Sequence, residues 1–128
     1  MNRPTPPSIA HLLREYETIF IMRPDATEEM TTRVRERVEG VVARLNAHLL
    51  SYDDWGKRKL AYEIRDRTAL KRHQKGLYIY LRLLGGNDLI AELERNFRML
   101  EPVLRYMTIK LDTDVIAEER LAQEAPAS

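Results

Sequence analysis

The chain contains no cysteine among its 128 residues. This absence excludes disulfides, thiol nucleophiles and cysteine-based zinc sites together. Histidine is also scarce, and the three present, His11, His48 and His73, are isolated along the sequence without the spacing of metal ligands. We therefore expect the protein to bind neither a metal nor a cofactor.

Long apolar runs are missing as well. No stretch approaches the roughly eighteen apolar residues of a membrane span, so we expect no membrane association. Residues 1–9 carry three prolines and lack the apolar core of a secretory signal. The length fits one domain, and we expect a cytoplasmic protein.

Signatures of catalysis are equally absent. Residues 85–86 are a Gly-Gly pair before a helical pattern, but the Lys and Ser or Thr of a phosphate-binding loop do not follow. The acids at 28–29 and 92–94 lie among polar neighbours, and no nucleophile has an evident activating base. We predict no catalytic residue, no small-molecule substrate and no enzyme activity.

The charge is unevenly distributed, although the net charge is only +1. Residues 55–82 hold nine Lys or Arg against two acids, a local net charge of +7, whereas the rest of the chain carries −6. Such a basic segment in a nearly neutral protein can meet phosphates. The alternative, a solvated charged loop, stays open on charge alone.

The first half of the chain reads as a strand followed by a long helix. Residues 16–22 are rich in β-branched and aromatic types, with both faces largely apolar, as in a central strand. Asp25 or Thr27 can cap a following helix. Apolar residues then recur at helical steps, at Met30, Val34, Val38, Val41, Val42, Leu45 and Leu49.

The second half supplies three more strands and a second helix. Residues 49–64 read as extended, with Gly56 marking a bulge or turn. In residues 77–84, leucine and isoleucine alternate with tyrosine and arginine, which is typical of a strand. A helix is predicted over 89–100 and a last strand over 103–111.

The order of elements is βαββαβ. It predicts an α+β, ferredoxin-like fold, with a four-stranded antiparallel sheet and two helices on one face. The other face of the sheet is then free for solvent or a partner. We expect a flexible N-terminal arm at 1–13, the folded domain at 14–111 and an acidic tail at 112–128 that can form a helix around 115–121.

A cationic cluster marks the middle of the chain. Lys57, Arg58 and Lys59 interrupt an alternating strand pattern, and Lys71, Arg72, His73 (when protonated) and Lys75 extend the positive charge. Arginine and lysine bind phosphate oxygens and release counterions, so binding should depend on salt. The nearby aromatic residues either stack on unpaired bases or pack in the sheet; they are Trp55, Tyr62, Tyr78 and Tyr80.

The stretch Gly56-Lys-Arg-Lys-Leu-Ala-Tyr-Glu-Ile64 resembles the signature of bacterial small-subunit ribosomal protein six. Residues 16–25 are similar to the first strand and turn of that family. Residues 93–98 and 103–107 resemble its second helix and last strand. The similarity covers about residues 14–111. The chain departs from the pattern at Glu15, where the family often has a basic residue or histidine.

This resemblance implies a structural constituent of the small ribosomal subunit in the bacterial cytoplasm. It also implies binding to the central domain of small-subunit ribosomal RNA together with ribosomal protein eighteen, in support of platform assembly and translation. Taken with the charge pattern, the candidate rRNA-binding residues are Arg14, Tyr16, Lys57, Arg58, Lys59, Lys71, Arg72, Lys75, Arg98 and Arg105. The candidate contacts to the protein partner are Trp55, Tyr78 and Tyr80.

Three other functions fit the same order of elements. An acylphosphatase-like hydrolase requires an arginine-bearing anion loop after the first strand, where this chain has Asp25 in the turn. An RNA-recognition motif requires a glycine- and aromatic-rich third strand, which residues 75–80 match only in part. A small-molecule-binding regulatory domain is supported by the order of elements alone.

Overall fold

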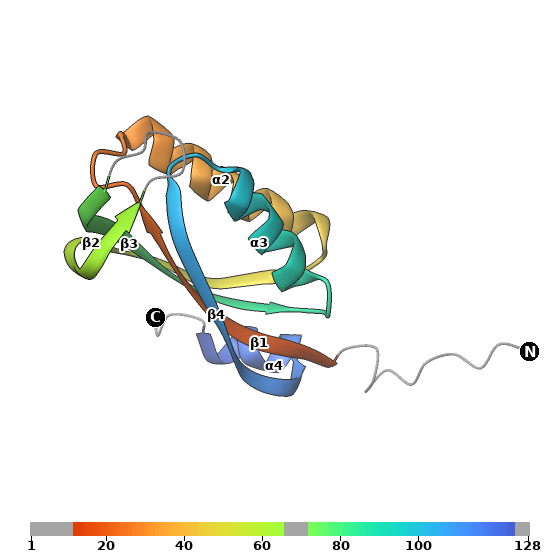
Figure 1. The fold of residues 1–128 in the computed structure, drawn as a ribbon. Coiled ribbons are helices and arrows are strands. Elements are labelled where there is room, and N and C mark those ends of the chain that lie inside the picture. The colour runs from red at the N-terminus through yellow and green to blue at the C-terminus, as the bar shows by residue number, and fades with distance from the viewer. Residues whose placement is uncertain (1–11, 66–71, 125–128) are drawn as a thin grey trace, which may run out of the picture.

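The structure, a computed structural model, describes residues 12–65 and 72–124. Its elements are, in chain order, β1 (Leu12–Met22), α2 (Glu28–Arg44), β2 (His48–Arg65), β3 (Arg72–Gly85), α3 (Leu89–Met99), β4 (Val103–Ile116) and α4 (Ala117–Glu124). The strands form one antiparallel sheet in the order β2-β3-β1-β4. Helices α2 and α3 cover one face, and α4 lies on the opposite side, near β1 and β4 (Figure 1). The predicted ferredoxin-like fold is confirmed.

Helix α2 forms where the valine pattern predicts it, but it is shorter than expected. Thr27 caps its N-terminus, with the side-chain oxygen accepting a hydrogen bond from the backbone N–H of Met30 at 3.2 Å. The helix ends at Arg44 because Asn46 takes a left-handed conformation with φ of 54°. The apolar pattern runs on to Leu49, which is also the first residue of the predicted extended stretch 49–64; Leu49 pairs with Leu83 in the sheet, so the extended assignment is the correct one.

Strand β2 contains the predicted irregularity at Gly56. The pairing of β2 with β3 shifts register between Asp54 and Gly56, and Gly56 has φ of +80°. Its backbone N–H donates a hydrogen bond to the Asp54 carboxylate at 2.7 Å. A residue without a Cβ takes this left-handed conformation at little cost, so the predicted bulge is confirmed.

The core lies between the sheet and the pair α2 and α3. Even-numbered residues of β1 and odd-numbered residues of β3 point into it, and the rings of Phe20 and Phe97 pack with their centroids 4.7 Å apart. Buried Thr18 shares a 2.8 Å hydrogen bond between hydroxyls with Thr108, which ties β1 to the edge strand β4. The helices and the sheet are thus joined by one apolar layer.

The outer strands of the sheet extend beyond their predicted bounds. β1 begins at Leu12 rather than at residue 16, and β4 continues to Ile116 rather than ending at residue 111. The added residues pair with each other, Leu12 with Ile116 and Leu13 with Val115. Each extension therefore exists because the other provides its hydrogen bonds. The following helix, α4, covers residues within the predicted tail.

Candidate nucleic-acid interface

The face of the sheet turned away from α2 and α3 carries the site. Because side chains alternate along strands, this face collects odd-numbered residues of β1 and β4 and even-numbered residues of β3. We call it the open face. Three rows of residues cross this face, each listed from β4 through β1 and β3 to β2. The first row is Arg105, Ile21, Tyr78 and Gly56, and the second is Met107, Ile19, Tyr80 and Asp53. The third row is Ile109, Glu17, Arg82 and Ser51.

Two stacked rings form an aromatic platform on the open face. The ring of Trp55 lies parallel to that of Tyr80, with centroids 5.0 Å apart and an interplanar angle of 8°. The hydroxyl of Tyr80 donates a 2.7 Å hydrogen bond to the Glu17 carboxylate. Burial and this hydrogen bond raise the pKa of Tyr80 to about 12, so the hydroxyl remains a donor at neutral pH. Trp55 is 39% exposed, which leaves a fixed aromatic surface for a partner.

The cationic cluster lies beside this platform. Lys57, Arg58 and Lys59 are exposed on β2, with Lys59 opposite exposed Lys75 on β3. We call these four residues the basic hairpin. The Arg58 guanidinium lies 5.1 Å from the centre of the Trp55 ring, within the range of a cation–π interaction. In the described part of the chain, no carboxylate forms a salt bridge with these four residues, so their charge is available to an anion.

A glycine allows β3 of the hairpin to lie close against the side chain of Ile21 on β1. Gly76 pairs with Arg58 and is buried. A Cβ at this position would lie 2.3 Å from Cγ2 of Ile21, closer than any side chain tolerates. The hairpin therefore keeps its position against β1 only with glycine at residue 76.

Three other predicted contacts are a residue outside the described part of the chain, a residue whose side chain is not described, and a residue far from the basic hairpin. Lys71 is outside the described residues, and Arg72 pairs with Arg65 in the ladder, although its side chain is not among those described. Arg14 lies opposite Gly85, at the other end of β1 from Met22. Eight residues of strand separate Arg14 from that end, about 26 Å, so Arg14 lies well apart from the basic hairpin.

The remaining predicted contacts differ in their surroundings. Tyr16 is only 8% exposed and packs in the core, because an even-numbered residue of β1 points toward the helices. Arg98 is exposed on α3 and donates a 3.1 Å hydrogen bond to the hydroxyl of Tyr106. Arg105 is exposed on the open face, beside Ile21. Tyr16 therefore contributes to the core, whereas Arg105 lies on the open face at the edge opposite the aromatic platform.

Sequence reasoning missed the apolar strip along the edge strand. Met107, Ile109 and Leu111 are all exposed, and they continue the open face past Ile19 and Glu17. The signal was present in β4, where these apolar residues alternate with polar ones. Together with the aromatic platform they form an apolar surface of the kind that marks a protein interface.

The fold is that of a ferredoxin-like protein, with an exposed sheet face that adjoins a basic hairpin. Within residues 12–65 and 72–124, no three acidic or histidine side chains gather as a metal site. Nor does this part of the chain contain a helix with the length and apolarity needed to cross a bilayer.

Comparison with known proteins gives the family. The model of ribosomal protein S6 matches residues 15–110, which span all four strands of the sheet, α2 and α3. The chain belongs to the ribosomal protein S6 family, whose members are structural proteins of the small ribosomal subunit and not enzymes. The predicted resemblance is thereby confirmed, and an enzymatic function is set aside.

Individual relatives are similar to this chain over most of their length. The chain is 41% identical to small ribosomal subunit protein bS6 of Syntrophobacter fumaroxidans, covering 88% of this chain and 73% of that protein. It is 42% identical to bS6 of Trichlorobacter lovleyi, covering 89% and 87% of the two chains. The crystal structure of 30S ribosomal protein S6 from Thermotoga maritima superposes with a TM-score of 0.68 at 28% identity, over 87% of this chain and 98% of that one.

Proposed function

We propose that the protein binds the central domain of small-subunit ribosomal RNA together with ribosomal protein eighteen, and so supports platform assembly and translation in the bacterial cytoplasm. The observation that carries the proposal is the basic hairpin, whose cations form no salt bridge within the described residues and lie next to the exposed ring of Trp55. Cations beside a fixed aromatic surface suit RNA, which offers phosphates and unstacked bases within a few ångströms of each other.

The cations would bind the phosphate backbone. Lys57, Lys59 and Lys75 supply mobile point charges, and Arg58 supplies a planar fork held over Trp55. Lys71 and Arg72 follow in sequence and would extend the same positive field. Phosphate contacts fix position rather than base sequence, which agrees with an architectural role.

Ribosomal protein eighteen would cover the open face. Trp55, Tyr78 and Tyr80 offer aromatic area at its centre, and the apolar strip on β4 continues it to the sheet edge. Burying such a surface against a protein removes apolar area from water, which stabilises the contact. Binding of the two partners would then be cooperative, because they adjoin at the aromatic platform.

The distant arginines would contact other RNA segments. Arg105 lies on the open face at the β4 edge of the sheet, the edge opposite β2, whereas Arg14 lies at the far end of β1 and Arg98 on α3. Tyr16 would act indirectly by supporting β1 from the core. Replacing any one of these arginines would therefore weaken RNA binding independently of changes in the basic hairpin.

The test measures binding of the full chain, with ribosomal protein eighteen, to a central-domain fragment of small-subunit RNA over a range of salt concentrations. We expect Arg58→Ala combined with Lys59→Ala to weaken binding and to flatten its salt dependence, since two phosphate contacts are lost. The control combines Arg33→Ala with Arg35→Ala, which removes the same charge from α2. An unchanged salt slope in the hairpin variant would contradict the proposal.

A further inference from the structure

The outer surface of the helical layer contains a groove of about 650 Å³. It runs between α2 and α3, on the side of the molecule opposite the open face. We call it the helix groove. Its lining contains four arginines and one acid, together with a glycine and a methionine: Arg33, Arg37, Arg44, Arg95, Glu36, Gly40 and Met99.

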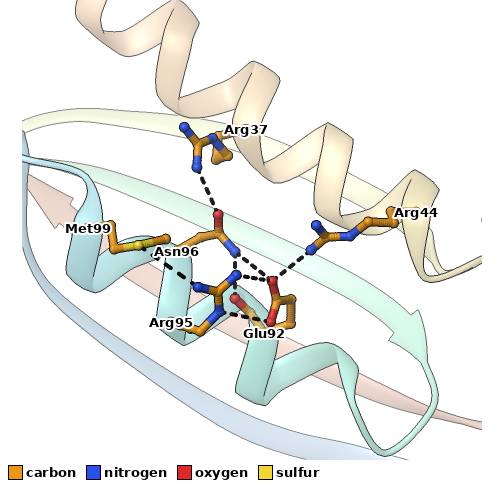
Figure 2. Close-up of polar contacts among 6 residues, drawn as sticks. All are labelled: Arg37, Arg44, Glu92, Arg95, Asn96 and Met99. Carbon is orange, nitrogen blue, oxygen red and sulfur yellow. Dashed lines mark hydrogen bonds and ion pairs between the residues drawn. The ribbon is translucent and has the colours of Figure 1, made fainter.

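Arginines from both helices converge in this groove on one carboxylate. Figure 2 shows Arg44 of α2 and Arg95 of α3 both reaching Glu92, each at 2.7 Å. The hydrogen bonds from Arg95, with the help of Arg44, lower the pKa of Glu92 to about 2. The groove is therefore already arranged to hold one carboxylate, with guanidinium groups on both of its walls.

A third arginine in the groove has no carboxylate of its own. Arg37 donates a 3.0 Å hydrogen bond to the side-chain oxygen of Asn96, a neutral acceptor. Asn96 is only 4% exposed, and its amide donates to the backbone oxygen of Glu92 at 2.8 Å. Among the described residues no acid pairs with Arg37. Its guanidinium is thus held in place while its charge remains uncompensated.

An apolar recess adjoins the arginines. Gly40 faces the groove, and a Cβ built there would meet no atom within 4 Å. On the opposite wall Met99 is 56% exposed, although it belongs to the helix whose apolar residues otherwise form the core. Methionine adapts its shape to varied apolar partners, so this pair offers room for an apolar side chain.

The charges on α2 and α3 argue against RNA as the occupant of the helix groove. Helices α2 and α3 together carry six arginines and six glutamates, so they present no extended positive face to a phosphate backbone. No aromatic side chain lines the groove for base stacking. A protein segment with a few acids and an apolar anchor matches both the local cations and the recess.

We propose that the helix groove docks an acidic, amphipathic segment of a partner protein. One carboxylate of that segment pairs with Arg37, and an apolar side chain one turn away sits between Gly40 and Met99. The stretch from Arg33 to Arg44 is about 16 Å long, which accommodates about three turns of a docked helix. This docking uses the face opposite the basic hairpin, so it is independent of the RNA interface proposed above.

The test uses the full chain, labelled with ¹⁵N, and a panel of synthetic acidic peptides of about three helical turns with glutamate and leucine one turn apart. We expect the peptides to shift the amide resonances of residues lining the groove. Two variants should each weaken binding about tenfold or more: Arg37→Glu, which reverses the uncompensated charge, and Gly40→Leu, which fills the recess.

The matched control is Arg35→Glu. Arg35 lies on the same helix but contacts the ring of Tyr52 and pairs with Glu39, outside the groove. It should leave the peptide affinity unchanged. Gly40→Leu should keep its fold, since leucine favours a helix more than glycine does.

Three results would overturn the proposal. One is the absence of shifts in the groove with every peptide of the panel. Another is equal peptide affinity in Arg37→Glu and Arg35→Glu. The third is displacement of the bound peptide by a single-stranded RNA oligonucleotide that itself shifts the groove resonances, which would assign the groove to RNA.

Discussion

The carboxylate of Glu15, near the start of β1, forms an ion pair with the guanidinium of Arg120 in α4, at the other end of the chain. Glu15 also accepts a 3.0 Å hydrogen bond from Arg82 of β3, and Arg82 in turn pairs with Glu124 of α4 at 2.7 Å. Glu15 is only 3% exposed, and the adjacent Leu84 is fully buried. Glu15 therefore anchors α4 over one end of the open face.

Replacing Glu15 should destabilise the protein. Glu15→Ala leaves the guanidinium groups of Arg82 and Arg120 partly buried without their shared carboxylate, and we expect the free energy of unfolding to fall by about 1–3 kcal/mol. Urea unfolding monitored by circular dichroism measures the change. Glu119→Ala, at an exposed position of α4, is the control and should change stability by less than about 0.5 kcal/mol. Equal losses in the two variants would show that the Glu15 ion pairs do not stabilise the fold.

Two glycines should respond in opposite directions to the same substitution. Gly40→Ala should raise the free energy of unfolding by about 0.5–1 kcal/mol, because alanine favours the helix and its Cβ meets open space. Gly76→Ala should lower it by about 1–3 kcal/mol, because the new Cβ would collide with Ile21. Thermal unfolding of both variants and of the parent protein measures these changes in stability. A Gly76→Ala variant as stable as the parent would show that residue 76 does not lie too close to Ile21 for a Cβ.

The two phenylalanines should dominate the energetics of the core. Phe20 and Phe97 are both fully buried and in contact, so truncating either leaves a cavity between the sheet and α3. We expect Phe20→Ala or Phe97→Ala to cost about 3–5 kcal/mol in chemical denaturation. Wild-type stability in either variant would mean that the ring is not part of the core.

Glu92 should make the stability depend on pH in the acid range. Its folded-state pKa of about 2 lies below the ordinary value of 4.5, so its ion pairs stabilise the protein above about pH 4.5 and are lost as pH falls toward 2. Glutamine at this position cannot ionise. The stability difference between the parent and Glu92→Gln should therefore be constant near neutral pH and shrink as pH drops from about 4.5 to 2.

Glu94→Gln, which removes an acid from the same helix, is the control for this experiment. Urea titrations at several pH values measure the unfolding free energies of the three proteins. A difference between the parent and Glu92→Gln that does not shrink in acid would show that Arg44 and Arg95 do not hold the Glu92 carboxylate ionised.

Several features could be predicted from sequence because they depend on local periodicity. The buried valines of α2 recur at helical steps, the alternation in β3 separates core from surface, and Gly56 marks a bulge wherever it lies in the sheet. The basic hairpin was predictable for the same reason, since Lys57, Arg58 and Lys59 are neighbours in the chain.

Other features depended on which elements meet in space. The pairing of Leu12 with Ile116 extends two strands whose isolated patterns gave no reason to continue. The burial of Tyr16 follows from the face of β1 that the helices cover, a choice that alternation alone leaves open. Likewise, the helix groove exists only because α2 and α3 pack side by side.

The sequence by itself determined the order of elements, the family and the position of the basic hairpin, since each is a pattern of adjacent or regularly spaced residues. Only the tertiary structure decided that Glu15 is held by Arg82 and Arg120, and that Arg37 has no acidic partner among the residues that the structure describes. The physical reason is that electrostatic partners are chosen by distance in space, and a residue far along the chain becomes a neighbour only once the sheet and helices have packed.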